Sequence, residues 1–413
     1  MRGMTASSVV YLLSKTFLRK YVRKWIMVVG IAIWVFSVFA STFVQASMFW
    51  LFMFLRGMVG IGEASYAVVS PSIIADMFTG TNRSRMLMFF YFAIPCGSGF
   101  GFMVGSSVAA MTGVVCLFLI IVFVKEPARG GAERPVHGPK KIRTSYFEDL
   151  KSLAGNATYV FSTAGYTAMI FMVGTMSWWV PTAIEHNYAH ERGLNSTDQL
   201  DPDTKAQLVN TLVFLVNLIF GAITCIGGLV GVTVGSILSQ WLHEGVGPFR
   251  SVKTVRSDAI VCGLGALISI PSLYFALREI PYNMAATWVR KKGLVCLKKL
   301  MVLMFICITS TCFNWATNVN MLMEVVVPTR RNAAVSWQTL ISHLFGDASG
   351  PYVLGMISDA IRGDDTSPYG NFTSLVASFY LPNFLLVIST ASFFAAAYTF
   401  VRDQKIVEEE MSE

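Results

Sequence analysis

The chain has 413 residues, of which 54% are hydrophobic and only 14% are charged, well below the roughly 25% charged content of soluble domains. The charges gather between apolar stretches that are long enough to cross a bilayer, so an ordinary soluble domain is excluded. The net charge of +8 comes largely from basic residues in loops between these stretches, a pattern typical of membrane topology. We therefore expect a membrane protein with no nucleic-acid partner.

Ten apolar segments follow one another along the chain. Basic clusters that face the cytoplasm must be separated by an even number of spans, and the apolar lengths allow two between neighbouring clusters. This pattern predicts an all-α polytopic membrane protein with both termini cytoplasmic. The ten expected spans are residues 26–44, 48–76, 86–107, 109–124, 159–184, 214–241, 258–277, 300–325, 334–357 and 376–401.

The longest polar stretch, rich in Pro, Gly and charge, predicts a linker between two helical bundles. A transporter made of two six-helix halves would have six spans before this linker, whereas only four full spans and a short N-terminal remnant precede it. We therefore expect the first hairpin to be missing. The expected units are an incomplete N-terminal bundle (1–125), a cytoplasmic linker (126–155), a six-helix bundle (156–402) and a cytoplasmic tail (403–413).

Seven cysteines lie in or beside apolar segments without metal-ligand spacing, so we expect free thiols and no metal. No nucleotide-binding loop or nucleophile elbow occurs, and we expect neither a cofactor nor enzymatic activity. Two features do not fit a simple hairpin pattern. The basic segment 278–300 falls where the count requires the lumenal side, and the turn between residues 107 and 111 is very short.

One span carries charges that are costly in hydrocarbon. Arg56 and Glu63 lie seven residues apart, two helical turns, and therefore share one face among small residues that we expect to pack into protein. One interpretation is a buried pair that joins helices. The other is that Glu63 exchanges a proton while Arg56 tunes it or binds an anionic headgroup. Asp76 lies near Arg83 and Arg85 at the cytoplasmic end, and we interpret these three as a gate.

The second half carries two more polar pairs with helical spacing. Asn314 and Asn318 are four residues apart, as are His343 and Asp347. Such groups line a substrate cavity or form hydrogen bonds between helices, and both hypotheses stay open. One His and one Asp are too few ligands for a metal site. Two sequons in expected lumenal loops predict glycosylation at Asn195 and Asn371.

The stretch "RGMVGIGEASYAVVSPSIIADMFTGTNRSRMLMFFYFAIPCGSGFGFMVGS" resembles the Spinster family of the major facilitator superfamily. So do "KEPARGGAE", "ITCIGGLVGVTVGSILS" and "VVVPTRRNAAVSWQTLISHLFGDASGPYVLGMISDAI". The resemblance implies a lipid transporter that works by alternating access on lysophospholipids or sphingolipids such as sphingosine 1-phosphate. It also implies a late endosomal or lysosomal membrane, or the plasma membrane, and coupling to protons in some members. Glu63 and Arg56 match charged positions of the family's fourth helix.

Three departures from the family are visible. The first helix and its acidic residue are missing, the turn near residue 109 is short, and Arg19 stands where the superfamily loop has an aspartate. From the residues and the resemblance together we expect a proton-linked lipid transporter. A facilitator of small polar solutes and a non-transporting paralogue that acts as an interaction partner are the alternatives.

Overall fold

The computed structural model describes most of the two expected bundles. The described residues are 23–45, 47–97, 146–191, 193, 196, 213–247, 250, 252–283 and 291–412, and the side chains of 213–221, 279–283 and 291–298, among others, are left out of the description. The expected span 109–124, the turn near residue 109, the N-terminal remnant and Asn195 lie outside this set. Within it every regular element is a helix, as the hydropathy pattern predicts.

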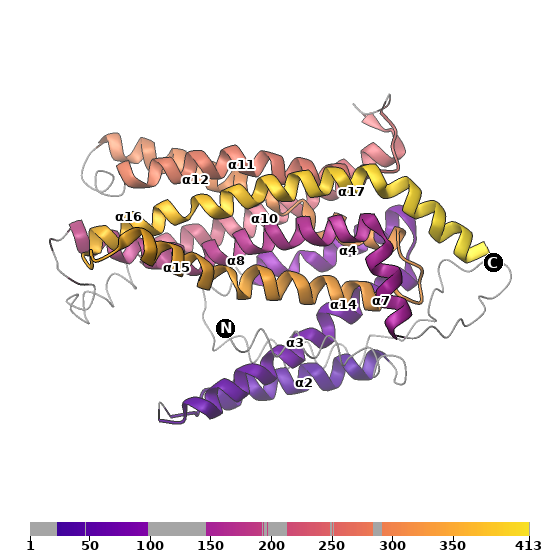
Figure 1. Cartoon of the computed structure of the whole chain (residues 1–413), viewed down its shortest axis with the longest axis horizontal. Coiled ribbons are helices and arrows are strands. Elements are labelled where there is room, and N and C mark those ends of the chain that lie inside the picture. The colour runs from indigo at the N-terminus through magenta and orange to yellow at the C-terminus, as the bar shows by residue number, and fades with distance from the viewer. Residues whose placement is uncertain are drawn as a thin grey trace.

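The first described helices form an antiparallel pair (Figure 1). Helix α2 (Arg23–Ser41) packs along α3 (Phe49–Met77), and α4 (Gly80–Tyr91) turns back from the end of α3. Gly30, Gly62 and Ser65 form the contact between α2 and α3, and a Cβ on either glycine would collide with the opposite helix. The small residues of α3 therefore allow close packing, as the sequence indicates.

The C-terminal bundle contains the six expected helical paths. Several of its helices run side by side along the long axis, while α2 and α3 cross at an angle and lie to one side (Figure 1). The short α7 lies near the end of the bundle where α17 ends. The elements are α7 (Tyr146–Gly155), α8 (Ala157–Glu191), α10 (Val213–Glu244), α11 (Ser257–Asn283), α12 (Lys291–Thr311), α13 (Asn314–Glu324), α14 (Arg331–Ser342), η5 (His343–Ala348), α15 (Gly350–Arg362), α16 (Pro368–Ser378) and α17 (Tyr380–Ser412).

Three of the expected single spans are interrupted. The path from α12 to α13 breaks at Cys312 and Phe313, just after Ser310 and Thr311 donate hydrogen bonds to carbonyls one turn earlier. Such bonds compete with the backbone ladder and bend helices. The last path breaks at Phe379, and α14 and α15 are joined by the π-helical turn η5. A hydropathy count cannot locate these breaks because it averages over a window and does not register local hydrogen bonding.

Seven helices among the described residues are long and apolar enough to cross a membrane. The α14–η5–α15 path is too polar to be one of them, although it is continuous in the fold and packs against α8. Helix α17 continues through the residues expected as a tail, up to Ser412. The main core joins both bundles, since Leu87 and Tyr91 of α4 pack with residues of α10, α11, α13 and α17.

Candidate functional site

Two of the three charged residues of α3 are not packed into protein. Arg56 and Glu63 are both exposed, and Arg56 lies over the ring of Phe52, 4.9 Å from its centroid. The prediction that this face is enclosed is therefore wrong for the two charges. Consecutive helical residues point about 100° apart, so Gly62 can face α2 while Glu63 points away from it. No ion pair joins Arg56 to Glu63 in the described part of the chain.

Glu63 lies near the polar pair of the other bundle. Its charge interacts with His343 and Asp347, and the same helix α3 packs against α14. Nδ1 of His343 lies 2.9 Å and 3.1 Å from the two carboxylate oxygens of Asp347. The His343 side chain is 36% exposed, so the pair is accessible to water. The fold thus brings together two acids and one imidazole that the sequence separates by 280 residues.

The π-helical turn that carries this pair is held against α8. A Cβ on Gly174 would collide with the backbone of Asp347, and one on Gly346 would lie 2.9 Å from Ile170. These close approaches seat η5 directly on α8. Single π-turns inside helices occur frequently at functional sites, where they redirect a side chain. Here the turn contains both His343 and Asp347.

The two asparagines of α13 are buried within the C-terminal bundle. Nδ2 of Asn314 donates to the sulfur of Met169 at 2.9 Å, and Nδ2 of Asn318 donates to Gln338 at 2.9 Å. Both residues are fully buried. These contacts tie α13 to α8 and α14 and favour the alternative of hydrogen bonding between helices. Their Oδ1 atoms are buried without a hydrogen-bond partner in the described structure.

At the cytoplasmic end, Arg83 connects the two bundles. It lies in the first turn of α4 and is buried, with Nη2 3.0 Å from Oε1 of Glu324 and Nε donating to Oδ1 of Asn320 at 2.9 Å. A buried guanidinium requires such partners because removing it from water costs several kcal/mol. The expected gate residue therefore forms its contacts with α13 of the opposite bundle.

The network continues to residues that the sequence analysis did not single out. Asn320 donates to Oδ2 of Asp258 at 2.6 Å, and Ser239 donates to Oδ1 of the same carboxylate at 2.5 Å. Asp258 is buried at the start of α11, and Ser239 belongs to α10. One connected set of hydrogen bonds thus links α4, α10, α11 and α13. On the surface beside it, Thr81 donates to Glu244 at 2.6 Å.

A sequence signal for this network exists. Asp76 precedes Arg83 by seven residues at the junction of α3 and α4, and Glu324 precedes Arg331 by seven at the junction of α13 and α14. The same spacing of acid and arginine occurs at equivalent places in the two bundles, as internal repeats produce. Comparing the two halves would have identified Glu324. Asp76 is buried, whereas Arg85 is exposed.

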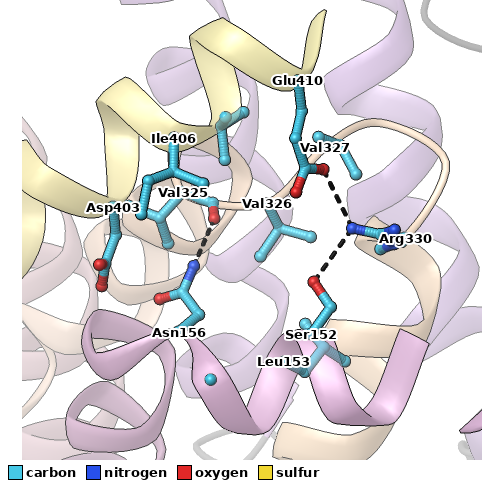
Figure 2. A pocket seen from close by; sticks show the side chains of 12 residues that line it. Ser152, Leu153, Asn156, Val325, Val326, Val327, Arg330, Asp403, Ile406 and Glu410 are labelled. Atoms are coloured by element: carbon cyan, nitrogen blue, oxygen red, sulfur yellow. Dashed lines mark hydrogen bonds and ion pairs between the residues drawn. The ribbon is translucent and has the colours of Figure 1, made fainter. Parts of the chain in front are cut away.

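A second cytoplasmic cluster surrounds Arg330. Its guanidinium contacts Asp149 at 3.2 Å, Ser152 at 3.0 Å and Glu410 at 3.1 Å, so it joins α7 to α17. Figure 2 shows the pocket that Arg330, Ser152 and Glu410 line together with Asn156. Its volume of about 90 Å³ holds about three water molecules, far too little for a lipid. We assign it a structural role in fastening the linker helix to α17.

The lumenal end contains the second sequon. Asn371 lies in α16, where Nδ2 donates to the carbonyls of Thr366 at 3.2 Å and Ser367 at 3.0 Å. Its Oδ1 accepts a hydrogen bond from Arg362. The amide nitrogen that would carry a glycan is therefore already used in hydrogen bonds in the folded protein. Glycosylation at Asn371 stays a prediction that requires attachment before this segment folds.

Beside it lies a histidine outside the apolar span of α8. His186 is six residues beyond Val180, where that span ends, and its Nδ1 is buried without a hydrogen-bond partner in the described structure. Burial, together with the positive charge of Arg362, lowers the pKa of His186. The lowered pKa favours the neutral form of this imidazole.

This arrangement of two helical bundles with polar contacts between them defines a membrane transporter of the major facilitator class. The Major Facilitator Superfamily matches residues 3–289, more than half of the chain. The chain belongs to this superfamily and, within it, to the Spinster family. It is not a member of an enzyme family, as the sequence predicts.

The family follows from its relatives. Protein spinster homolog 1 of Homo sapiens is 35% identical over 400 residues, which cover 94% of this chain and 70% of that protein. The sphingosine-1-phosphate transporter SPNS2 of Mus musculus is 34% identical over 412 residues, covering 95% and 68%.

Solved structures show the same fold. A bacterial homologue of the human lysosomal transporter Spinster, in an inward-facing and unoccupied conformation, superposes with a TM-score of 0.59 at 15% identity, over 97% of this chain and 90% of that one. The fucose:proton symporter of E. coli also has a TM-score of 0.59, at 11% identity, over 96% and 89%. At such identities the likeness concerns the fold alone.

Proposed function

We propose that this protein carries a lysophospholipid or a sphingolipid, such as sphingosine 1-phosphate, across its membrane by alternating access. The observation that carries the proposal is the cluster of Glu63, His343 and Asp347, to which both bundles contribute residues. It occurs in a chain related to a sphingosine-1-phosphate transporter. A site between bundles can change its accessibility when the bundles rock against each other.

The substrate would be recognised by its two unlike ends. An anionic or zwitterionic headgroup would bind near Arg56, whose guanidinium is exposed beside Glu63 on the same helical face. The acyl or alkyl chain would lie against the Phe, Met and Leu side chains that dominate these helices. His343 and Asp347 would complete the polar part of the cavity.

The cluster would also couple transport to protons. A carboxylate near a histidine–aspartate pair takes up and releases protons as one unit, because each charge alters the others. Glu63 would be the group that changes charge between the two accessible states. An acidic compartment supplies the gradient, so we place the protein in late endosomes or lysosomes, with the plasma membrane as the other location.

The buried bond between Arg83 and Glu324 would act as the cytoplasmic gate. It joins α4 of one bundle to α13 of the other, so it must break before the cytoplasmic ends can separate. Asp76 and Arg331 would contribute at the equivalent positions of the two halves.

Flux of a labelled lysophospholipid into vesicles that contain the purified protein tests this proposal. We expect flux that depends on a pH difference, and loss of this dependence in Glu63→Gln, because an amide cannot take up the proton. Glu408→Gln is the matched control, since Glu408 is exposed on α17 far along the chain from the cluster. An unchanged pH dependence in Glu63→Gln would remove Glu63 from the mechanism.

The same assay separates the alternatives. Competition by a sugar or a small organic anion, but not by lysolipid, would indicate a facilitator of small polar solutes. A folded protein without flux of any of these would indicate an interaction partner that does not transport.

A further inference from the structure

Two cysteines from different bundles lie near each other. Cys96 lies in the helical turn that follows α4, and Cys225 lies in α10. The two thiols are close enough to interact, and both side chains are half-buried and not part of a disulfide. The pair joins segments that are far apart in sequence and lie on opposite sides of the expected linker.

The backbones of the two helices also approach closely at this point. Gly228 lies three residues after Cys225, so both are on one face of α10. A Cβ on Gly228 would collide with the ring of Pro95 and lie 3.6 Å from its Cα. A disulfide requires Cα atoms about 4.4–6.8 Å apart. The contact between Gly228 and Pro95 lets the two backbones approach closely one turn from Cys225 and one residue from Cys96, as such a bond would need.

The other cysteines that the structure describes have different surroundings. Cys262 is buried 3.1 Å from the hydroxyl of Thr317 within the C-terminal bundle. Cys307 and Cys312 are buried, both near the end of α12. Among the described thiols, Cys96 and Cys225 are therefore the pair that spans the two bundles.

The pair lies in the lumenal half of the membrane. Cys96 is sixteen residues beyond Gly80, where α4 begins at the cytoplasmic end, which is about 24 Å along a helix. Cys225 is nineteen residues before the cytoplasmic end of α10 at Glu244, or about 28 Å. The bilayer core is only about 30 Å thick, so both thiols lie beyond its middle.

We propose that Cys96 and Cys225 form a reversible disulfide, with a peroxide as the oxidant, that fastens the lumenal halves of α4 and α10 together. One thiol releases its proton, and the thiolate attacks the peroxide, breaking its O–O bond to give a sulfenic acid and a hydroxide that takes up the released proton as the first water. The second thiol then attacks that sulfur, and a second water leaves as the S–S bond forms. Two electrons pass from the two sulfurs to the peroxide. A small neutral oxidant such as a peroxide suits this site. An oxidant that carries charge, such as a charged small-molecule disulfide, would be costly to bring into an apolar interface.

The consequence rests on the proposed transport function. Alternating access requires the lumenal halves of the two bundles to separate in one state. A covalent bond between α4 and α10 in that half prevents the separation. Oxidation would therefore stop transport with the lumenal side closed, and reduction would restore it.

Peptide mass spectrometry of the vesicle-embedded protein tests the bond directly. After treatment with hydrogen peroxide we expect a linked peptide that contains Cys96 and Cys225, which is absent after dithiothreitol and in Cys96→Ser or Cys225→Ser. Cys262→Ser is the matched control and should retain the linked peptide. If both thiols react with a maleimide as fully after peroxide as before, the proposed bond does not form. This measurement needs no variant, so a poorly folding substitution does not obscure it.

Two measurements test whether the disulfide keeps the lumenal halves of α4 and α10 together. Lysophospholipid flux should fall in proportion to the cross-linked fraction, and amide hydrogen exchange at the lumenal ends of α4 and α10 should slow. Dithiothreitol should reverse both changes. If the disulfide forms completely but amide hydrogen exchange at these helix ends is unchanged, the bond does not hold the two halves together and the proposal is wrong. Absence of flux in the reduced protein would count against the proposed function. Hydrogen exchange would still show whether the disulfide prevents α4 and α10 from separating.

Discussion

Each buried charge of the cytoplasmic network is bonded to a group from another helix. The guanidinium of Arg83 contacts Asn320 and Glu324, and the carboxylate of Asp258 accepts hydrogen bonds from Ser239 and Asn320. Burial of an ion is tolerable only when such contacts replace its hydration. The exposed charges of α3 lack this enclosure, which leaves Glu63 accessible to water and protons.

At the residue scale, His186 should make stability depend on pH. Its pKa lies below the ordinary value, so as pH falls through about 6.5 the unfolded chain binds a proton that the folded chain does not. The free energy of unfolding therefore decreases until the folded pKa is reached. Replacing His186 by Gln should lessen the drop in thermal unfolding midpoint between neutral and acidic buffer.

The control for this prediction is His190→Gln. His190 is on the same helix but exposed, where its ring stacks on Tyr369 with centroids 4.7 Å apart. This variant should keep the acid sensitivity of the unmodified protein. Equal acid sensitivity of all three proteins would show that His186 does not cause it.

At the scale of elements, packing between α8 and η5 fixes the place of the central cluster. Gly174 lets the backbone of Asp347 lie directly on α8, and Gly346 admits Ile170 from the same helix. The position of the His343–Asp347 pair therefore depends on small residues that carry no charge themselves. Helix interfaces in membranes commonly use small residues in this way.

Gly174→Ala tests this dependence. The added methyl group must push η5 away from α8, and overpacking of this kind costs about 1–3 kcal/mol. We expect a lower thermal unfolding midpoint and a weaker pH dependence of flux, because Asp347 is displaced. Gly155→Ala is the control, since a Cβ there meets no atom within 4 Å. Matching behaviour of the two variants would contradict the role of close packing.

For the whole molecule, the contact between the bundles on the cytoplasmic side is the feature with the widest effect. Arg83→Ala leaves the half-buried carboxylate of Glu324 without its cation, which should destabilise the cytoplasm-closed state by about 1–3 kcal/mol. We expect the cytoplasmic ends of α4 and α13 to exchange amide hydrogens faster. Arg85→Ala should have little effect because Arg85 is exposed.

A charge exchange distinguishes a gate from general damage. Arg83→Glu combined with Glu324→Arg should recover part of the protection that either single change loses, since the pair can form again in reverse. If the double variant is as open as the sum of the single variants, Arg83 and Glu324 do not act as a pair.

Much of the fold and part of the site could be predicted from the sequence. Alternating apolar and basic segments predicted the helical paths, because a helix satisfies its own backbone hydrogen bonds and needs only enough apolar residues to cross the bilayer. The same rule identified Arg56 and Glu63 as unusual, since a charge inside such a segment is costly. Asp76 and Arg83 were predicted as a gate at the end of that segment. Family membership was equally visible, because motif order is a property of the chain itself.

Only the tertiary structure decided which side chains meet. Glu63 is near His343 and Asp347, Arg83 bonds with Glu324, and Cys96 lies near Cys225, each across a long sequence interval. It also decided that Asn314 and Asn318 donate hydrogen bonds to other helices of the same bundle. The physical reason is that hydropathy and helical period are local properties, whereas these contacts depend on how glycines such as Gly174 and Gly228 let separate helices approach.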